Sequence, residues 1–214
     1  MMNFINESIL EYSLKKSNKE SDILKKLRKE TNQKVLHPRM LTSPLQGRLL
    51  SLISKLIRPK KILEIGTYTG YGTLCLSEGL DSNGTIHTIE VNEELIDFQN
   101  KFFNQSDKKN QIIQHVGNAL NLIKKISGPF DIVFLDADKG NYINYFELIS
   151  PKIKKGGLLI SDNVLWSGKV LEKTDKNDLD TQVIKKFNSL LQKNKTFETV
   201  LLPIRDGLSL SRKI

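Results

Sequence analysis

Carboxylate and amide side chains follow two apolar runs in the second half of the chain. In "FLDADKGNY", Asp136 comes directly after the run 130–135, and in "LLISDNVLWSG", Asp162 and Asn163 come directly after the run 157–161. If the two runs are neighbouring strands of a parallel sheet, their ends lie ~4.8 Å apart, so three oxygen ligands can converge on one cation. These hard ligands suit magnesium, calcium or manganese and leave octahedral positions for water or substrate.

Lys139 lies one helical turn beyond Asp136. Beside a bound cation an ammonium gives up its proton more readily, which would let this lysine act as a general base. The alternatives are a surface lysine and, for each aspartate alone, a helix cap or a solvated loop. Two such motifs at the ends of successive strands favour the metal site. Zinc is disfavoured, because the three histidines are dispersed and the cysteine is solitary.

A glycine-rich motif, "EIGTYTGYG" over residues 64–72, stands at the end of another apolar run. Gly66 and Gly70 let the backbone approach a ligand closely. The spacing G-x-x-x-G-x-G differs from the G-x-G-x-x-G of nicotinamide sites and does not suit a pyrophosphate. Glu90 ends the next run, where a carboxylate can accept hydrogen bonds from both ribose hydroxyls. Together these features favour a ribose-bearing ligand without a pyrophosphate, such as S-adenosylmethionine; the alternatives are a plain turn and a solvated strand end.

The elements that would position these residues alternate between strand-like and helix-like segments. Five short apolar runs separated by amphipathic segments predict a parallel sheet covered by helices on both faces. The last two runs, "FETVLLP" and "GLSLSRK", are joined by only a few residues, which permits a hairpin but not a parallel crossover. The sequence therefore predicts an α/β fold with a seven-stranded, mostly parallel sheet and an antiparallel C-terminal pair. The five parallel runs are "KILEI", "TIHTIE", "QIIQHV", "FDIVFL" and "GLLIS".

The segment before the sheet is predicted to be helical. Residues 1–36 are polar and lysine-rich, with apolar positions spaced for two short helices. Ser43 and Pro44 suit the N-cap and first position of a third helix, and Arg58-Pro59 suits its end. Five apolar residues fall on one face of that helix: Leu45, Leu49, Leu52, Ile53 and Leu56.

The composition indicates one soluble domain. The chain has 214 residues, and its apolar runs are strand-sized, far short of the ~20 residues of a membrane helix. The N-terminus has no basic, then apolar, secretion signal, so we expect a cytoplasmic protein. The net charge of +9 could indicate nucleic-acid binding, but it comes from 27 lysines and only six arginines, spread along the chain. Arginine is preferred for phosphate and base contacts, so nucleic acid is disfavoured as a partner.

Several motifs in order resemble the cation-dependent O-methyltransferases, the family of caffeoyl-CoA and catechol O-methyltransferases, and especially its small bacterial members. The resemblance runs from about residue 35 to the C-terminus. It implies a Rossmann-like class I methyltransferase fold in a single domain, 1–214, with residues 1–36 as a helical lid or dimerisation segment. The motifs are "MLTSPLQGRLL", "ILEIGTYTGYGTLCL", "HTIEVN", "FDIVFLDADKGNY", "LLISDNVLWSGKV" and "LLPIRDGLSL".

The resemblance also implies roles for individual residues. Asp136, Asp162 and Asn163 would bind a divalent metal, with magnesium preferred over calcium or manganese, and Lys139 would be the catalytic base beside Asp136. Trp166 and Ser167 would contact the substrate, although Trp166 could be an ordinary buried aromatic. The residues expected around S-adenosylmethionine are Thr42, Glu64, Gly66, Thr67, Gly72, Glu90, Ala119, which would lie beside the adenine, Asp136 and Asp138.

Two departures from the family pattern limit what the resemblance implies. Gly72 replaces a serine found in many relatives, which removes one hydroxyl contact to the cofactor, and the N-terminal lysine motif of the plant enzymes is not recognisable. The expected reaction is methyl transfer from S-adenosylmethionine to a hydroxyl of a catechol-like or hydroxycinnamoyl-type phenol, by a homodimer. The rivals are an RNA-binding methyltransferase or RNA-binding module, motivated by the charge, and a nicotinamide-dependent reductase, disfavoured by the glycine spacing.

Overall fold

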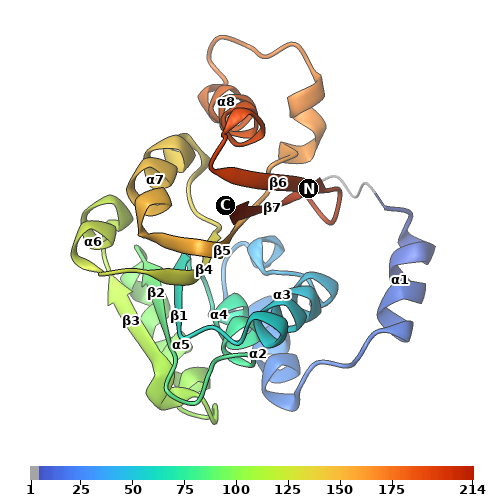
Figure 1. Cartoon of the computed structure of the whole chain (residues 1–214). Helices are drawn as coiled ribbons and strands as arrows, with labels where there is room; N and C mark the ends of the chain where they lie inside the picture. The colour runs from blue at the N-terminus through green and yellow to red at the C-terminus, as the bar shows by residue number, and fades with distance from the viewer. Residues whose placement is uncertain (1–4) are drawn as a thin grey trace.

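A computed structural model describes residues 5–214 and shows a central seven-stranded sheet (Figure 1). The strand order is β3-β2-β1-β4-β5-β7-β6. β1 to β5 pair in parallel, and β7 lies antiparallel between β5 and β6. This confirms the predicted sheet and its C-terminal pair. The strands are β1 Lys61–Ile65, β2 Thr85–Glu90, β3 Ile112–Val116, β4 Phe130–Leu135, β5 Ile153–Asp162, β6 Phe197–Leu202 and β7 Leu208–Lys213.

Helices cover both faces of the sheet (Figure 1). α6, α7 and α8 bury apolar side chains on one face, and α2 to α5 bury theirs on the other. β4 is buried at all six positions, because it lies in the middle of the sheet between both helical layers. The helices are α1 Glu7–Lys16, α2 Asp22–Lys34, α3 Pro44–Ile57, α4 Tyr71–Ser77, α5 Ile96–Phe103, α6 Ala119–Lys125, α7 Tyr142–Ile149 and α8 Leu179–Lys193.

The two predicted N-terminal helices are present as α1 and α2; residues 1–4 of the predicted segment lie outside the described residues. α1 buries none of its residues, whereas α2 buries Leu24, Leu27 and Thr31. α2 is therefore packed more tightly against the rest of the chain than α1 is. Within residues 5–214, no helix is long and apolar enough to cross a membrane.

α3 begins and ends where the sequence predicts. The Ser43 hydroxyl accepts a hydrogen bond from the Gln46 N–H at 3.3 Å, and Arg58 ends the helix in the left-handed region with φ 50°. Its buried face is not the leucine-rich stripe. The structure buries the neighbouring face, which is Gln46, Gly47, Leu50, Ser51 and Ser54. Of the predicted stripe, Leu45, Leu49 and Ile53 are half-buried, and Leu52 and Leu56 are exposed.

The order of the strands reverses at β1, whose neighbours are β2 on one side and β4 on the other. Ligands of open α/β sheets bind at the carboxyl ends of the strands beside such a reversal. The loops that follow β1 and β4 touch there, because the Asp136 N–H donates to the Ile65 carbonyl at 2.9 Å. This edge of the sheet holds most of the residues with predicted chemical roles.

Candidate active site

The predicted metal ligands and the predicted base meet at the ends of β4 and β5. Asp136 follows β4 directly, and Asp162 is the last residue of β5, which pairs with β4. The Lys139 ammonium lies 3.1 Å from Asp136 Oδ1 and is itself buried. Burial, and then the nearby negative charge of Asp136, raise the pKa of Asp162. Asp136, Lys139 and Asp162 therefore lie together in the fold, and Asn163 follows Asp162 directly.

Tyr142, one turn beyond Lys139, holds the lysine from the other side. Its hydroxyl lies 2.7 Å from Lys139 Nζ, 2.9 Å from the Asp162 carbonyl and 3.2 Å from the Leu135 carbonyl. The tyrosine is completely buried, and burial raises its pKa well above the ordinary value, so the hydroxyl stays neutral. It accepts from the ammonium while it donates to a strand-end carbonyl. Lys139 is thus fixed between a carboxylate and a phenol.

Asp162 is held by partners from three parts of the chain. Its Oδ2 accepts from the Gln46 side chain of α3 at 2.8 Å, and its Oδ1 accepts from the Asn163 N–H at 2.8 Å. The Arg205 guanidinium lies 3.9 Å from Oδ2. These contacts fix the orientation of the Asp162 carboxylate, and none of them is a close ion pair that would neutralise its charge.

The loop after β5 carries Asn163, Trp166 and Ser167 in strained backbone conformations. Their φ angles are 58°, 48° and 53°, in the left-handed region that non-glycine residues seldom adopt. Asp206 stabilises the loop: its Oδ1 accepts from the Ser167 N–H at 2.5 Å, and its Oδ2 accepts from the Asn163 side-chain amide at 3.4 Å. Trp166 is half-buried and packs against the core, as expected for an ordinary buried aromatic. It also lies three residues after Asn163 in the same loop.

The residues at this edge fit a hard divalent cation. The candidate ligands are two carboxylates and one amide, all oxygen donors, and the negative charge of Asp136 opposes ionisation of Asp162, a repulsion that a cation would relieve. In residues 5–214, no three side chains among His, Cys, Asp and Glu cluster around a point, so the set depends on the Asn163 amide. Such a set is unsuited to zinc.

Glu64 is a fully buried carboxylate at the reversal of the sheet. Its side chain accepts hydrogen bonds from the hydroxyls of Thr73 and Thr88, the latter at 2.6 Å. Burial, followed by the charges of Asp136 and Glu90, raises its pKa to about 8. The negative charges of Glu64, Glu90 and Asp136 therefore repel one another at the ends of β1, β2 and β4. A cationic ligand would relieve that repulsion.

Glu90 ends β2, as the sequence predicts. Its two carboxylate oxygens accept from the backbone N–H groups of Tyr68 at 2.7 Å and Asn92 at 2.8 Å. Each oxygen keeps a lone pair for a further donor such as a ribose hydroxyl. Ala119, the first residue of α6, is close by in the fold, because the Gly117 N–H donates to the Glu90 carbonyl at 2.8 Å.

Two of the glycines predicted to contact the cofactor lie against other parts of the chain, which occupy the space that a side chain would fill. A Cβ on Gly66, whose φ is 99°, would lie 1.9 Å from the Asp136 carbonyl oxygen. A Cβ on Gly72 would lie 2.7 Å from Glu64 Oε1. The close approach at Gly66 is therefore to the neighbouring loop, and the missing side chain at Gly72 leaves space for the Glu64 carboxylate.

The remaining predicted cofactor residues differ in exposure. Thr67 is buried, with its hydroxyl 2.5 Å from that of Thr88. Thr42 is buried just before α3. Asp138 is exposed, and its carboxylate already accepts from the Tyr145 hydroxyl at 2.6 Å and from the Asn141 amide at 2.5 Å. Of these three, Asp138 is the least available to a ligand.

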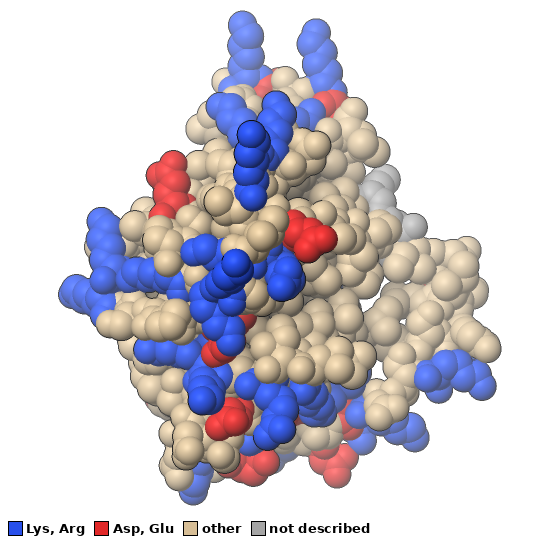
Figure 2. All heavy atoms as spheres, viewed as in Figure 1, with Lys and Arg blue, Asp and Glu red and all other residues tan. Residues whose placement is uncertain are grey.

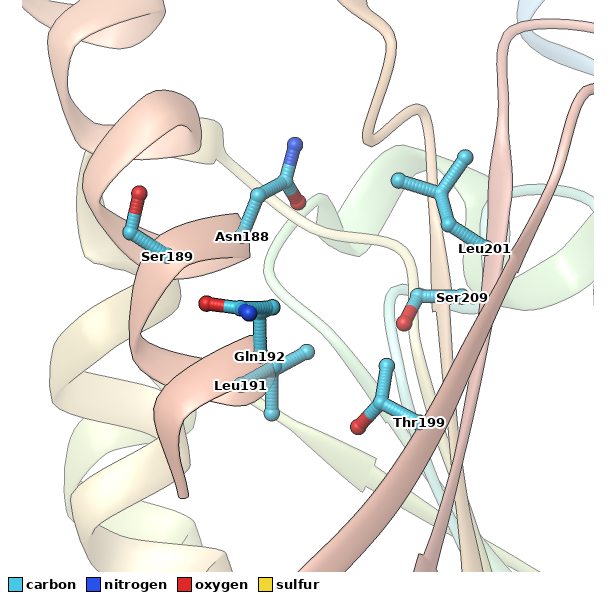
Figure 3. Close-up of a pocket in the computed structure, with 7 residues that line it drawn as sticks. All are labelled: Asn188, Ser189, Leu191, Gln192, Thr199, Leu201 and Ser209. Atoms are coloured by element: carbon cyan, nitrogen blue, oxygen red, sulfur yellow. The ribbon is translucent and has the colours of Figure 1, made fainter.

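A cavity of about 500 Å³ lies elsewhere, between α8 and the β6–β7 hairpin (Figure 3). None of the predicted site residues lines it. Its walls are Asn188, Ser189, Leu191, Gln192, Thr199, Leu201 and Ser209.

Sequence reasoning missed four residues that hold the site: Gln46, Tyr142, Arg205 and Asp206. Tyr142 had a local signal, because it lies three residues after Lys139 in "DKGNY" and helical spacing brings such pairs together. Gln46, Arg205 and Asp206 occur in motifs that carry the family resemblance, but only the packing of α3 and the β7 loop against β5 brings them to Asp162 and Asn163.

Comparison with known proteins matches residues 14–214 to the O-methyltransferase family. The chain is 32% identical to a caffeoyl-CoA O-methyltransferase of Stellaria longipes, over 92% of this chain and 85% of that protein. It is 31% identical to a catechol O-methyltransferase of Niastella koreensis, over 81% and 82% of the two chains. The structure of an O-methyltransferase of Bacillus cereus in complex with SAH (S-adenosylhomocysteine) superposes with a TM-score of 0.89 at 28% identity, covering 97% of both chains.

These matches confirm the expected fold and reaction class. The sheet order and the superposition identify a class I methyltransferase fold, and the family match covers nearly all of the described chain. The chain belongs to the O-methyltransferase family and is an O-methyltransferase enzyme.

Proposed function

We propose that this enzyme transfers the methyl group of S-adenosylmethionine to a phenolic hydroxyl of a catechol-like or hydroxycinnamoyl-type acceptor, with a divalent cation. The observation that carries the proposal is the meeting of Asp136, Lys139 and Asp162 at the buried ends of two neighbouring strands. An acid pair with a lysine held beside it suits deprotonation of an acceptor next to a cation.

The cofactor half of the proposal is supported by the carboxylates at the sheet reversal. S-adenosylmethionine carries a sulfonium and an ammonium, and Glu64 is a buried carboxylate that receives hydrogen bonds from hydroxyls alone. Glu90 has free lone pairs for ribose hydroxyls at the end of β2. The solved structure of the Bacillus cereus relative contains SAH, the demethylated product of the same cofactor.

The cation would be held by Asp136, Asp162 and Asn163. When bound, such an ion lowers the pKa of a phenol that it contacts, as metals do for coordinated water. As a neutral amine, Lys139, which is held by Asp136 and Tyr142, would take the phenolic proton and become an ammonium. Gln46 keeps Asp162 aimed at the site. An acceptor with two adjacent hydroxyls would be favoured, because it can chelate the ion and so fix one oxygen for attack.

Removal of the metal tests the proposal. We expect a chelator to abolish methylation of a catechol, to leave S-adenosylmethionine binding largely intact by calorimetry, and to be reversed by added magnesium. Asp162→Ala should behave like the chelated enzyme, because it removes one of two anionic ligands. Asp107→Ala, at an exposed position after α5, is the matched control. Full catechol methylation in excess chelator, with Asp162→Ala equally active, would overturn the metal assignment.

The rival partner, nucleic acid, has a separate test. Figure 2 shows basic side chains spread over the visible face, with acidic side chains among them, and no single basic stripe on that face. A filter-binding assay with a salt titration measures phosphate contacts directly, because each neutralised phosphate steepens the salt dependence. Tight RNA binding with a steep salt slope would favour the rival.

We also propose that the enzyme is a homodimer. Large apolar side chains are exposed towards the C-terminal end of α3: Leu52 is 55% exposed and Leu56 76%. A second copy of the chain is the occupant that we assign to this surface, since an O-methyltransferase of small molecules needs no other protein there.

A further inference from the structure

A buried carboxylate, Asp206, lies beside the candidate metal site and contacts one of its proposed ligands. Asp206 is 1% exposed and comes just before β7. We propose that Asp206 is a positioning residue: it orients the Asn163 side chain so that the amide oxygen, and not the amide nitrogen, faces the metal position. This inference rests on the proposed metal site.

Asp206 is fixed by contacts with the loop after β5. Its Oδ1 accepts from the Ser167 N–H at 2.5 Å, and its backbone carbonyl accepts from the Leu165 N–H at 2.9 Å. The next residue, Gly207, accepts from the Val164 N–H at 3.2 Å. Oδ1 accepts from Ser167, which leaves Oδ2 facing the Asn163 amide nitrogen at 3.4 Å.

The chemistry of the two groups decides the orientation of the amide. An ionised carboxylate only accepts hydrogen bonds, whereas an amide presents NH₂ on one side and an oxygen on the other. The NH₂ group of Asn163 must therefore face Asp206, which turns Oδ1 to the opposite side. A cation is bound by the oxygen and repelled by the NH₂ group, so a flipped amide would remove one of three ligands. Partners of this kind commonly change metal affinity 10–100-fold.

Asp206→Asn should reverse this preference with little change in shape. The shorter contact, to the Ser167 N–H, would keep the single oxygen of the new side chain. The new NH₂ group would then face Asn163 and favour the flipped amide. We expect the affinity for Mn²⁺, measured by calorimetry on the protein without acceptor, to fall by roughly tenfold or more. The affinity for S-adenosylmethionine should change by less than about twofold, because Asn163 makes no hydrogen bond with Glu64 or Glu90, the carboxylates proposed to bind the cofactor.

A second substitution separates orientation from charge and from structural damage. Asn163→Asp in the Asp206→Asn background places a carboxylate at 163 that accepts from the new NH₂ group and still offers an oxygen to the cation, so Mn²⁺ affinity should recover. Asn163→Asp alone sets two carboxylates against each other and should not improve Mn²⁺ binding. This opposite response in the two backgrounds is the expected coupling.

The outcomes are distinct. Unchanged Mn²⁺ affinity in Asp206→Asn, or the same effect of Asn163→Asp in both backgrounds, would overturn the orienting role while leaving the metal site in place. A wild-type protein that binds no Mn²⁺ would overturn both the metal site and the role of Asp206. Unfolding midpoints without metal show whether Asp206→Asn keeps the fold, and a folded variant with weakened Mn²⁺ binding supports the proposal.

Discussion

We predict that the buried Glu64 makes cofactor binding depend on proton release. Its pKa of about 8 means that it is mostly protonated at pH 7 in the free protein, because burial disfavours the charge. A cationic ligand favours the ionised form, so binding of S-adenosylmethionine should expel a proton. Affinity should therefore rise as pH increases from 6 to 8, by up to about tenfold per pH unit, and level off above the pKa.

Proton counting checks this prediction for Glu64. Calorimetry at pH 7 in two buffers of different ionisation enthalpy measures the protons released on binding. Glu64→Gln keeps the size of the side chain without the titration, so its affinity should be independent of pH and weaker than that of the wild type above pH 8. A wild-type protein that releases no proton at pH 7 would contradict the assignment.

At the scale of elements, the pairing of β2 with β3 carries a histidine pair. His87 Nδ1 lies 2.9 Å from His115 Nε2, and the rings are stacked. Burial, followed by the neighbouring histidine, lowers the pKa of His87 to about 4, and burial lowers that of His115. Below pH 6.5 the unfolded chain therefore binds protons that the folded chain does not, so stability should fall as pH drops from 6.5 towards 4.

Urea unfolding at pH 7 and pH 5 tests the histidine pair. His87→Gln should lose less stability than the wild type between these two values, whereas His37→Gln, at an exposed position, should lose as much as the wild type. Glu64 acts in the opposite direction, since a raised pKa makes stability fall as pH rises from 4.5 to 8, and comparison of variants removes that contribution. Equal losses in wild type and His87→Gln would refute the role of the pair.

The elements themselves were predictable because each has a local cause. Strand runs of buried apolar residues, the Ser43 cap and the short last connection all act within a few residues of chain. The buried face of α3 was not predictable from the apolar pattern. α4 approaches α3 so closely that a Cβ on Gly47 would lie 2.6 Å from the Tyr71 ring and a Cβ on Gly79 2.2 Å from the Ser54 carbonyl carbon. Small residues, not leucines, permit that contact.

The same distinction applies to the site. The acidic residues could be located because each follows a strand, and parallel strands bring their ends together. Their partners Gln46 and Asp206 come from α3 and from the loop just before β7, more than 40 residues away in sequence from Asp162 and Asn163. No local pattern encodes such a meeting, because it depends on how whole elements pack.

At the scale of the whole molecule, the exposed end of α3 predicts the assembly. Light scattering of the purified protein should give about twice the 24.4 kDa mass of one chain. Replacing both Leu52 and Leu56 by Glu should give a monomer, because burial of two charges in an apolar interface is strongly unfavourable. Leu179→Glu, at a position 66% exposed on α8, should remain dimeric. A wild-type monomer at micromolar concentration would contradict the prediction.

The place of β7 governs how the molecule is completed during synthesis. It follows both β5 and β6 in the sequence, yet it fills an interior position of the sheet between them. Until residues 208–213 leave the ribosome, β5 and β6 each present an unpaired edge, the kind of edge from which aggregation starts. Asp206 also follows Asn163 in the sequence, so its contact with the Asn163 amide forms only after both segments have been made. A chain that stops before residue 208 is therefore expected to aggregate through these two edges and to lack the contact that holds the Asn163 loop.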